Sequence, residues 1–222
     1  MADKDTTWRP LFRMAAVAAL FTILTIPAQV VLYVISPPPE SVEAWFAHFA
    51  MNPALALINL DLLYISSQVL LIPVFLALFI ALRNDVSAVP LVALAVGFFG
   101  VVIHTTSNPS IDMLLASQRY ASATTETERQ VFLAVGEGLM IQWQGTAYAL
   151  GYIIGGVAVL LFSLAMRKSA VFGHAIAWTG IVLGGLWLVP ASFGVVGLTL
   201  SFLSLLPTVI WLSLLARRFW MM

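Results

Sequence analysis

The 222-residue sequence predicts an all-α, polytopic membrane protein: one integral membrane domain, built as a six-transmembrane-helix bundle with a small external helical cap between spans three and four. Hydrophobic residues make up 61% of the chain and charged residues 9%, whereas soluble domains are about 45–50% apolar. The mean hydropathy is +1.01. Six apolar segments are each long enough to cross a hydrocarbon core of ~30 Å as a helix. Together these observations exclude an ordinary soluble domain.

The predicted spans cover residues 14–35, 54–82, 88–107, 139–166, 170–190 and 197–216. The first follows a basic flank and is too long for a signal-peptide core, so we interpret it as an uncleaved helix. In order, the spans are separated by the segments SPPPESVE, RNDVS, SNPSIDMLLASQRYASATTETERQ, RKS and PASFG, which have polar or turn-forming composition. Only the third separator is long enough to fold by itself.

That third separator, at about residues 108–137, is the predicted external cap. Thr125 followed by Glu128 matches a capping box, so we expect a helix to begin near Glu126. We expect this helix to end at the flexible residues 136–138, where the fourth span begins. The stretch IDMLLASQRY is predicted to form a second, interfacial helix.

The distribution of basic residues predicts the orientation. Eight of the ten fall on one side of the predicted threading: Lys4, Arg9, Arg13, Arg83, Arg167, Lys168, Arg217 and Arg218. By the positive-inside rule this side is cytoplasmic, so we expect both termini to be cytoplasmic. Arg119 and Arg129 fall on the other side, within the cap.

Polar residues gather at one depth near the outer boundary of spans two, three and four. Counting about 20 residues from the charged ends of these spans locates the boundary, and helical spacing indicates which residues share a face. We expect the stripes to converge on a pocket open to the outside. Its candidate ligand-binding residues are Asp61, Gln68, His104, Asn108, Glu137, Gln144 and Tyr148.

His104 admits two interpretations. It could act as a general base or metal ligand with Asp61, Asp112 or Glu137 as its partner. Alternatively, it is a neutral packing residue and the carboxylates are solvated groups at the interface. The second interpretation is favoured because these residues are shallow, where burial of polar groups costs little.

The sequence predicts neither a cofactor nor a metal site. It contains three histidines and no cysteine, and the histidines lack the spacing of zinc-binding motifs. No nucleophile motif of the G-x-S-x-G type occurs. The balance of ten basic and ten acidic residues does not indicate a nucleic-acid partner.

The second half of the chain resembles the bacterial multi-pass membrane family known as domain of unknown function 4386. The shared features run through residues 97–220: an Asn-Pro after span three, a Tyr-Ala before an acidic Thr-rich turn and a Gly-Thr that opens span four. A Met-Arg-x-Ser loop, a Pro-ended fifth span, a Leu-Pro-x-x-Ile-Trp and an Ala-Arg-Arg follow. The resemblance implies a protein of the bacterial cytoplasmic membrane, and it transfers no catalytic residue.

We therefore expect a non-catalytic accessory protein whose outer pocket binds a membrane lipid or a small amphiphile. The alternatives are a membrane enzyme that acts on a lipid head group through His104 and a carboxylate, and a passive small-molecule transporter. The glycine-rich faces of spans four and five are expected either to pack within one chain or to form a homo-oligomer.

Overall fold

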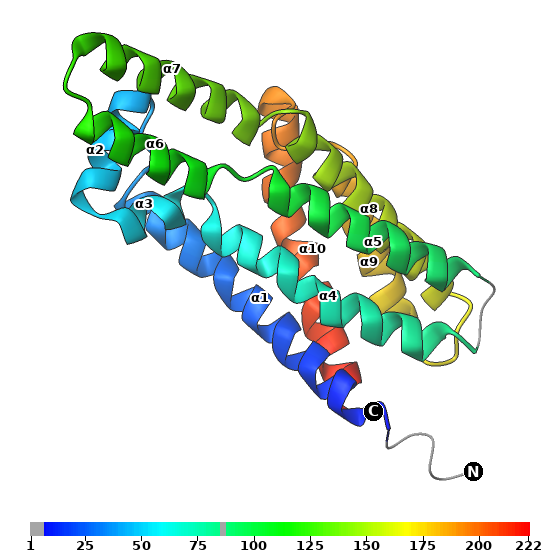
Figure 1. The fold of residues 1–222 in the computed structure, drawn as a ribbon. Coiled ribbons are helices and arrows are strands. Elements are labelled where there is room, and N and C mark those ends of the chain that lie inside the picture. The colour runs from blue at the N-terminus through cyan, green and yellow to red at the C-terminus, as the bar shows by residue number, and fades with distance from the viewer. Residues whose placement is uncertain (1–6, 85–87) are drawn as a thin grey trace.

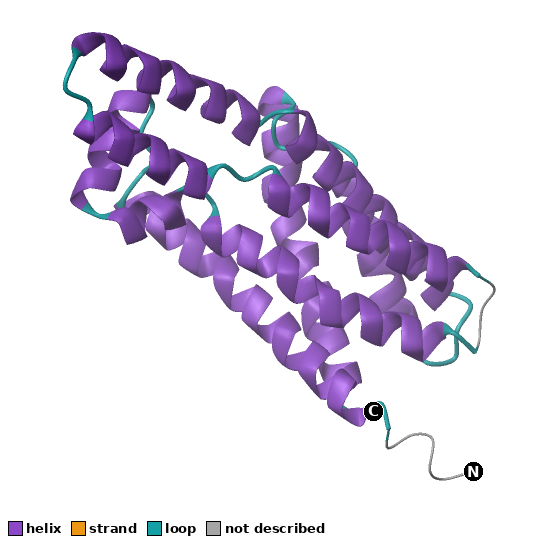
Figure 2. Ribbon diagram, viewed as in Figure 1, coloured by secondary structure: helices purple, strands orange, loops and turns teal. Residues whose placement is uncertain are grey.

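The computed structural model describes residues 7–84 and 88–222, and within these ranges it contains α-helices and no β-strand. Figure 2 shows these helices joined by loops and turns. In chain order they are α1 (Arg9–Ile35), α2 (Val42–Met51), α3 (Pro53–Asn59), α4 (Leu62–Leu82), α5 (Val89–Thr106), α6 (Ser110–Ser122), α7 (Glu126–Trp143), α8 (Thr146–Met166), α9 (His174–Trp187) and α10 (Gly194–Trp220). The all-helical prediction is confirmed.

Six of the helices form a closed ring in which each packs against the next one along the chain. The order is α1, α4, α5, α8, α9 and α10, and α10 packs back against α1. Figure 1 shows these helices along the long axis of the molecule. A large cluster of buried apolar side chains holds the ring together. Phe12 stacks on Phe219 at a ring-centroid distance of 5.9 Å, and this contact joins α1 to α10 near the chain termini.

The outer surface of the ring is apolar. Within the described residues, five helical segments, which contain α1, α4, α5, α8 and α10, have the length and composition of membrane spans. Large apolar side chains such as Phe21, Phe99 and Phe202 are exposed on them. An apolar surface of this extent is unusual for a water-soluble monomer and suits contact with lipid tails. The chain is therefore a multi-pass helical membrane protein.

The fifth predicted span forms a shorter helix than residues 170–190 would allow. α9 contains 14 residues and is about 21 Å long at 1.5 Å per residue, whereas the hydrocarbon core is ~30 Å thick. Gly173 precedes α9 in an extended conformation, and Pro190 disfavours helix in the residue before it. Hydropathy alone overestimates the length of this helix because the residues that flank it are equally apolar.

The second predicted span, residues 54–82, is divided at Asp61. α3 ends at Asn59, α4 begins at Leu62, and Asp61 has a left-handed backbone with φ of 63°. This conformation is uncommon outside glycine, but Asp is among the residues that adopt it most often. The prediction of one continuous span was wrong because no glycine or proline marks the break.

Four helices, α2, α3, α6 and α7, form a cap at the end of the ring opposite the beginning of α1 and the end of α10 (Figure 1). α6 and α7 correspond to the predicted cap, and α2 and α3 pack beside α6. The buried core of the cap consists of Val42, Trp45, Phe46, Phe49, Ala56, Leu60, Met113 and Ala116. The cap is larger than the predicted range 108–137 because residues 42–60 supply most of its core.

The predicted beginning of α7 is confirmed, and its predicted end is wrong. Thr125 and Glu128 form the complete capping box. The helix then continues through residues 136–138 to Trp143, so the fourth apolar segment begins its own helix, α8, at Thr146. A Cβ atom on Gly136 would lie 2.3 Å from Cγ1 of Val42. This glycine therefore permits close packing of α7 on α2 and does not interrupt the helix.

The glycine-rich faces of α8 and α9 pack against each other inside the chain. A Cβ on Gly156 would lie 2.8 Å from the carbonyl oxygen of Gly184, and the reverse distance is also 2.8 Å. A Cβ on Gly100 of α5 would lie 3.2 Å from the backbone nitrogen of Gly155 of α8. The small residues thus bring three neighbouring helices of the ring into close contact.

The ends of the ring differ in charge. The beginning of α1, the end of α10, the adjoining ends of α4 and α5, and the α8–α9 loop lie at the end opposite the cap (Figure 1). The basic residues at this end are Arg9, Arg13, Arg83, Arg167, Lys168, Arg217 and Arg218, while Lys4 lies outside the described residues. Arg119 and Arg129 belong to the cap helices α6 and α7.

Candidate functional site

A cavity of about 360 Å³ lies inside the ring, beneath the cap. Residues of α1, α4, α8, α9 and α10 line it, together with Trp143 and Gln144 at the end of α7. Along α10 the lining extends from Leu198 to Leu212, or about 21 Å of helix. This length is about two thirds of a ~30 Å hydrocarbon core. The volume falls within the range of about 300–1,000 Å³ that small-molecule pockets occupy.

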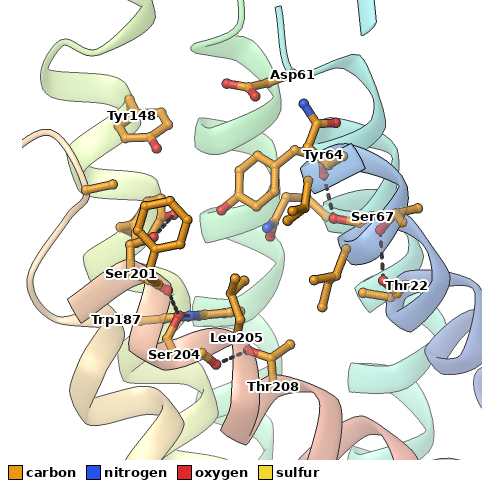
Figure 3. Close-up of a pocket in the computed structure, with 18 of the residues that line it drawn as sticks. Thr22, Asp61, Tyr64, Ser67, Tyr148, Trp187, Ser201, Ser204, Leu205 and Thr208 are labelled. Atoms are coloured by element: carbon orange, nitrogen blue, oxygen red, sulfur yellow. Dashed lines mark hydrogen bonds between the residues drawn. The ribbon is translucent and has the colours of Figure 1, made fainter. Parts of the chain in front are cut away.

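The polar end of the cavity is built around Asp61 (Figure 3). The hydroxyl of Tyr33 donates a hydrogen bond to Oδ1 of Asp61, and the indole Nε1 of Trp143 donates one to Oδ2 at 2.9 Å. Three separate segments meet here: the end of α1, the turn between α3 and α4, and the end of α7. The carboxylate is therefore held in place by its neighbours.

Burial changes the ionisation of Asp61, which lies in the turn before α4 and outside the membrane-spanning helices. Loss of solvation raises the pKa of this carboxyl above its ordinary value. The hydrogen bonds from Tyr33 and then Trp143 act in the opposite direction, because they stabilise the carboxylate. Desolvation is the larger effect, so Asp61 holds its proton to a higher pH than an exposed aspartate.

Hydroxyl groups line the deeper part of the cavity. Ser201, Ser204 and Thr208 lie on one face of α10 (Figure 3), as their spacing of three and four residues requires. The hydroxyls of Ser204 and Thr208 donate to carbonyl oxygens of their own helix. Nε1 of Trp187 donates to Oγ of Ser204 at 3.3 Å. These groups are satisfied locally, and each hydroxyl oxygen keeps further capacity as an acceptor.

Tyrosine is concentrated around the cavity. Four of the five tyrosines in the chain line it: Tyr33, Tyr64, Tyr148 and Tyr152. The ring centroids of Tyr148 and Tyr152 are 5.2 Å apart, and the hydroxyl of Tyr152 lies 3.1 Å from Oγ of Ser201. The wall near Asp61 is consequently aromatic, with polar hydroxyl tips.

The cavity opens sideways between α1 and α10. Val30 of α1 is 44% exposed, Leu198 of α10 is 50% exposed and Phe202 is 61% exposed, although all three line the cavity. The contact between Phe12 and Phe219 is at the other end of the same two helices. On this side the border of the cavity therefore reaches the apolar outer surface of the ring.

His104 lies behind the wall of this cavity and is 2% exposed. Its ring contacts those of Tyr64, Tyr148 and Tyr152 at centroid distances of 5.0, 5.2 and 5.6 Å. A Cβ on Gly151 would lie 2.4 Å from Nδ1 of His104, so a glycine is needed to admit the imidazole. Gly97, Gly100 and His104 are all buried, and their spacing of three and four residues puts them on one face of α5.

The structure brings together four of the seven residues predicted as ligand-binding candidates. Asp61, Gln68, Gln144 and Tyr148 line the cavity. His104 shares only a much smaller space with Gln68 on the far side of the tyrosines.

The remaining two candidates lie away from the cavity lining. The amide of Asn108 donates to the carbonyl oxygen of Leu60 at 2.6 Å and accepts from the backbone of Ser110, so it joins the α5–α6 turn to the α3–α4 break. Glu137 is exposed on α7, because the helix continues past the expected break.

Sequence analysis missed several residues of the site. The hydroxyl stripe of α10 was detectable, because Ser201, Ser204 and Thr208 have the spacing of one helical face. Tyr33 and Trp143 carry no comparable signal. Each lies at the end of its helix, and only the tertiary structure brings both to Asp61.

In the described part of the chain, His104 makes no hydrogen bond with a carboxylate, and its Nε2 has no partner. No group of three His, Asp or Glu side chains in the same residues is arranged to hold a metal ion.

The fold and the cavity together define a multi-pass helical membrane protein with an internal, laterally open and mainly apolar pocket. No family model, no curated protein and no solved structure matches the chain.

Proposed function

We propose that this protein binds a lipid or a small amphiphile in the cavity beneath its cap, as a non-catalytic accessory protein of the membrane. The observation that carries this proposal is the polarity gradient of the cavity. Asp61, the only charged residue among the described lining residues, forms one end with the side chains that hydrogen-bond to it. Farther along, Leu183, Leu205 and Leu212 are accompanied by hydroxyls, such as those of Ser204 and Thr208, that are bonded within their own helix. An amphiphile has the same division between a polar head and an apolar tail.

The lateral opening supports a ligand that arrives from the bilayer. Val30 and Phe202 are partly exposed at the border of the cavity, so a tail can enter without crossing the cap. This access suits a lipid-soluble ligand better than a water-soluble substrate.

We further propose that six helices cross the bacterial cytoplasmic membrane, with both termini cytoplasmic and the cap external. The ring of six helices supports this threading, because the short helix α9 occupies one position in the ring. A reporter that is active only outside the cytoplasm is expected to be active when it is fused after Gln118. Activity of a cytoplasm-specific reporter at the same position would contradict the threading. We likewise propose that this protein is related to the family known as domain of unknown function 4386, which its second half resembles.

Native mass spectrometry of three forms of the protein tests the binding function. The Leu205→Trp substitution fills the cavity, whereas Leu206→Trp adds the same side chain at a position that is 69% exposed and does not line it. We expect the wild type and Leu206→Trp to retain an amphiphile released from the membrane, and Leu205→Trp to lose it. Identical spectra from all three forms would reject the proposal.

A further inference from the structure

We propose that the amphiphile held in this cavity carries a cationic ammonium head group, for which Asp61 is the counter-charge. This inference rests on the proposed function and specifies the class of ligand. Three independent features of the polar end support it: its charge, its hydrogen-bonding groups and its aromatic wall.

The charge of the lining has one sign. Among the described residues that line the cavity, Asp61 is the only charged one, and no Lys, Arg or His accompanies it. A phosphate or carboxylate head group would meet a like charge there without a compensating cation, which is unfavourable in a partly buried site. An ammonium group would instead meet an opposite charge.

The hydrogen-bonding groups at this end include free acceptor capacity. Each oxygen of Asp61 accepts one bond from the protein, from Tyr33 and Trp143, and a carboxylate oxygen can accept a second. Gln29 lies one turn before Tyr33 and also lines the cavity. Within the described chain its buried Oε1 has no hydrogen-bond partner. These acceptors match a ligand that donates hydrogen bonds or carries positive charge.

The lining around Asp61 contains several aromatic side chains. Tyr64 and Tyr148 line the cavity together with Asp61 (Figure 3), and Tyr33 and Trp143 donate hydrogen bonds to its carboxylate. Aromatic faces attract cations, and the attraction increases when the cation is removed from water. A carboxylate accompanied by aromatic rings is therefore suited to an ammonium group, above all a quaternary one, which is weakly hydrated and apolar at its periphery.

Competition binding with two matched probes tests this inference. Dodecyltrimethylammonium and dodecyldimethylamine oxide have the same tail, but at pH 8 only the first carries a net positive charge. Each probe displaces a fluorescent fatty amine from purified wild-type protein, Asp61→Asn and Leu205→Trp. Asn tolerates the left-handed backbone of position 61, so Asp61→Asn removes the charge and keeps this backbone conformation. Its side-chain oxygen remains an acceptor, whereas its NH2 group cannot accept the hydrogen bond that the second carboxylate oxygen accepts in the wild type.

We expect wild type to bind the cation at least about tenfold more tightly than the amine oxide, and Asp61→Asn to abolish this preference without weakening the amine oxide. Equal affinity for both probes in wild type would overturn the cationic assignment, even if Asp61→Asn did not fold. If both probes bound equally and Leu205→Trp abolished their binding, the proposal that the cavity binds an amphiphile would still be supported. If Leu205→Trp did not change the binding of either probe, the proposal that the cavity is the binding site would be rejected as well.

The source of the ammonium group is determined separately by native mass spectrometry of protein prepared without either probe. A retained lipid with an amine head group would identify a membrane lipid as the ligand. A cavity that takes up the cation only when it is added would identify a small amphiphile from outside the membrane. A retained anionic lipid, lost in Leu205→Trp, would contradict the inference.

Discussion

The indole Nε1 of Trp143 donates a 2.9 Å hydrogen bond to Oδ2 of Asp61. This bond joins the last residue of the cap helix α7 to the turn from which α4 enters the ring. The same indole packs edge-on against Trp45 in the cap core, at a centroid distance of 6.3 Å. The cap and the polar end of the cavity are therefore one connected structure.

Replacing Trp143 by Phe tests this connection. The variant keeps an aromatic ring but leaves one oxygen of Asp61 without its donor, which costs about 1–3 kcal/mol for a buried acceptor. We expect a lower free energy of unfolding in detergent and faster amide hydrogen exchange in α7. Trp220→Phe is the control, because Trp220 is 62% exposed at the opposite end of the molecule. Equal stability of the two variants would show that the bond does not couple the cap to the ring.

Gly151→Ala tests whether the position of the His104 imidazole depends on the space left by the missing side chain of Gly151. The added Cβ would lie 2.4 Å from Nδ1 and 2.8 Å from the Cβ of His104, so α8 or the imidazole must move. Overpacking of this kind costs about 1–3 kcal/mol, and the tyrosine wall in contact with His104 should shift. Thermal unfolding of the variant should therefore begin at a lower temperature.

The matched control for Gly151→Ala is Gly185→Ala in α9, where the new Cβ meets nothing within 4 Å. This control should unfold at the wild-type temperature or slightly above it, because alanine favours helix over glycine. If both variants behaved alike, close packing at Gly151 would not be what holds His104.

The affinity for dodecyltrimethylammonium should depend on pH through Asp61. Burial raises the pKa of this carboxyl, and cation binding needs the ionised form. Affinity should therefore be complete above the raised pKa and be lost as the pH falls through it, at a higher pH than the ~3.9 of an ordinary aspartate. The groups around the carboxylate are Tyr33, Tyr64, Tyr148 and Trp143, and none of them gains or loses charge in acid.

Binding measured by fluorescence displacement from pH 4 to pH 8 checks this dependence, with Asp61→Asn as the reference. The variant should show low affinity that does not change with pH. A midpoint at or below the range of an ordinary aspartate, or the same pH profile in the variant, would assign the dependence to another group.

Hydropathy predicted the helical class and the multi-pass character correctly, and the Thr-x-x-Glu spacing predicted the capping box at Thr125, because each of these depends on local sequence. The break at Asp61 was missed because its cause is tertiary. The left-handed turn is held by Tyr33 and Trp143, and neither is near it in sequence. Helical spacing likewise placed Asp61 and Gln68 on one face, but it could not show that α10 supplies the opposite wall.

The central claim, that an amphiphile occupies the cavity from the bilayer side, is tested most directly by cysteine labelling. The chain contains no cysteine, so Ser201→Cys introduces one thiol into the cavity, and Leu203→Cys introduces one at a position of the same helix that is 58% exposed and does not line it. In lipid vesicles, a long-chain maleimide should label both positions. Added dodecyltrimethylammonium should slow labelling at Ser201→Cys and leave Leu203→Cys unchanged. Equal labelling rates at Ser201→Cys with and without the amphiphile would contradict the account.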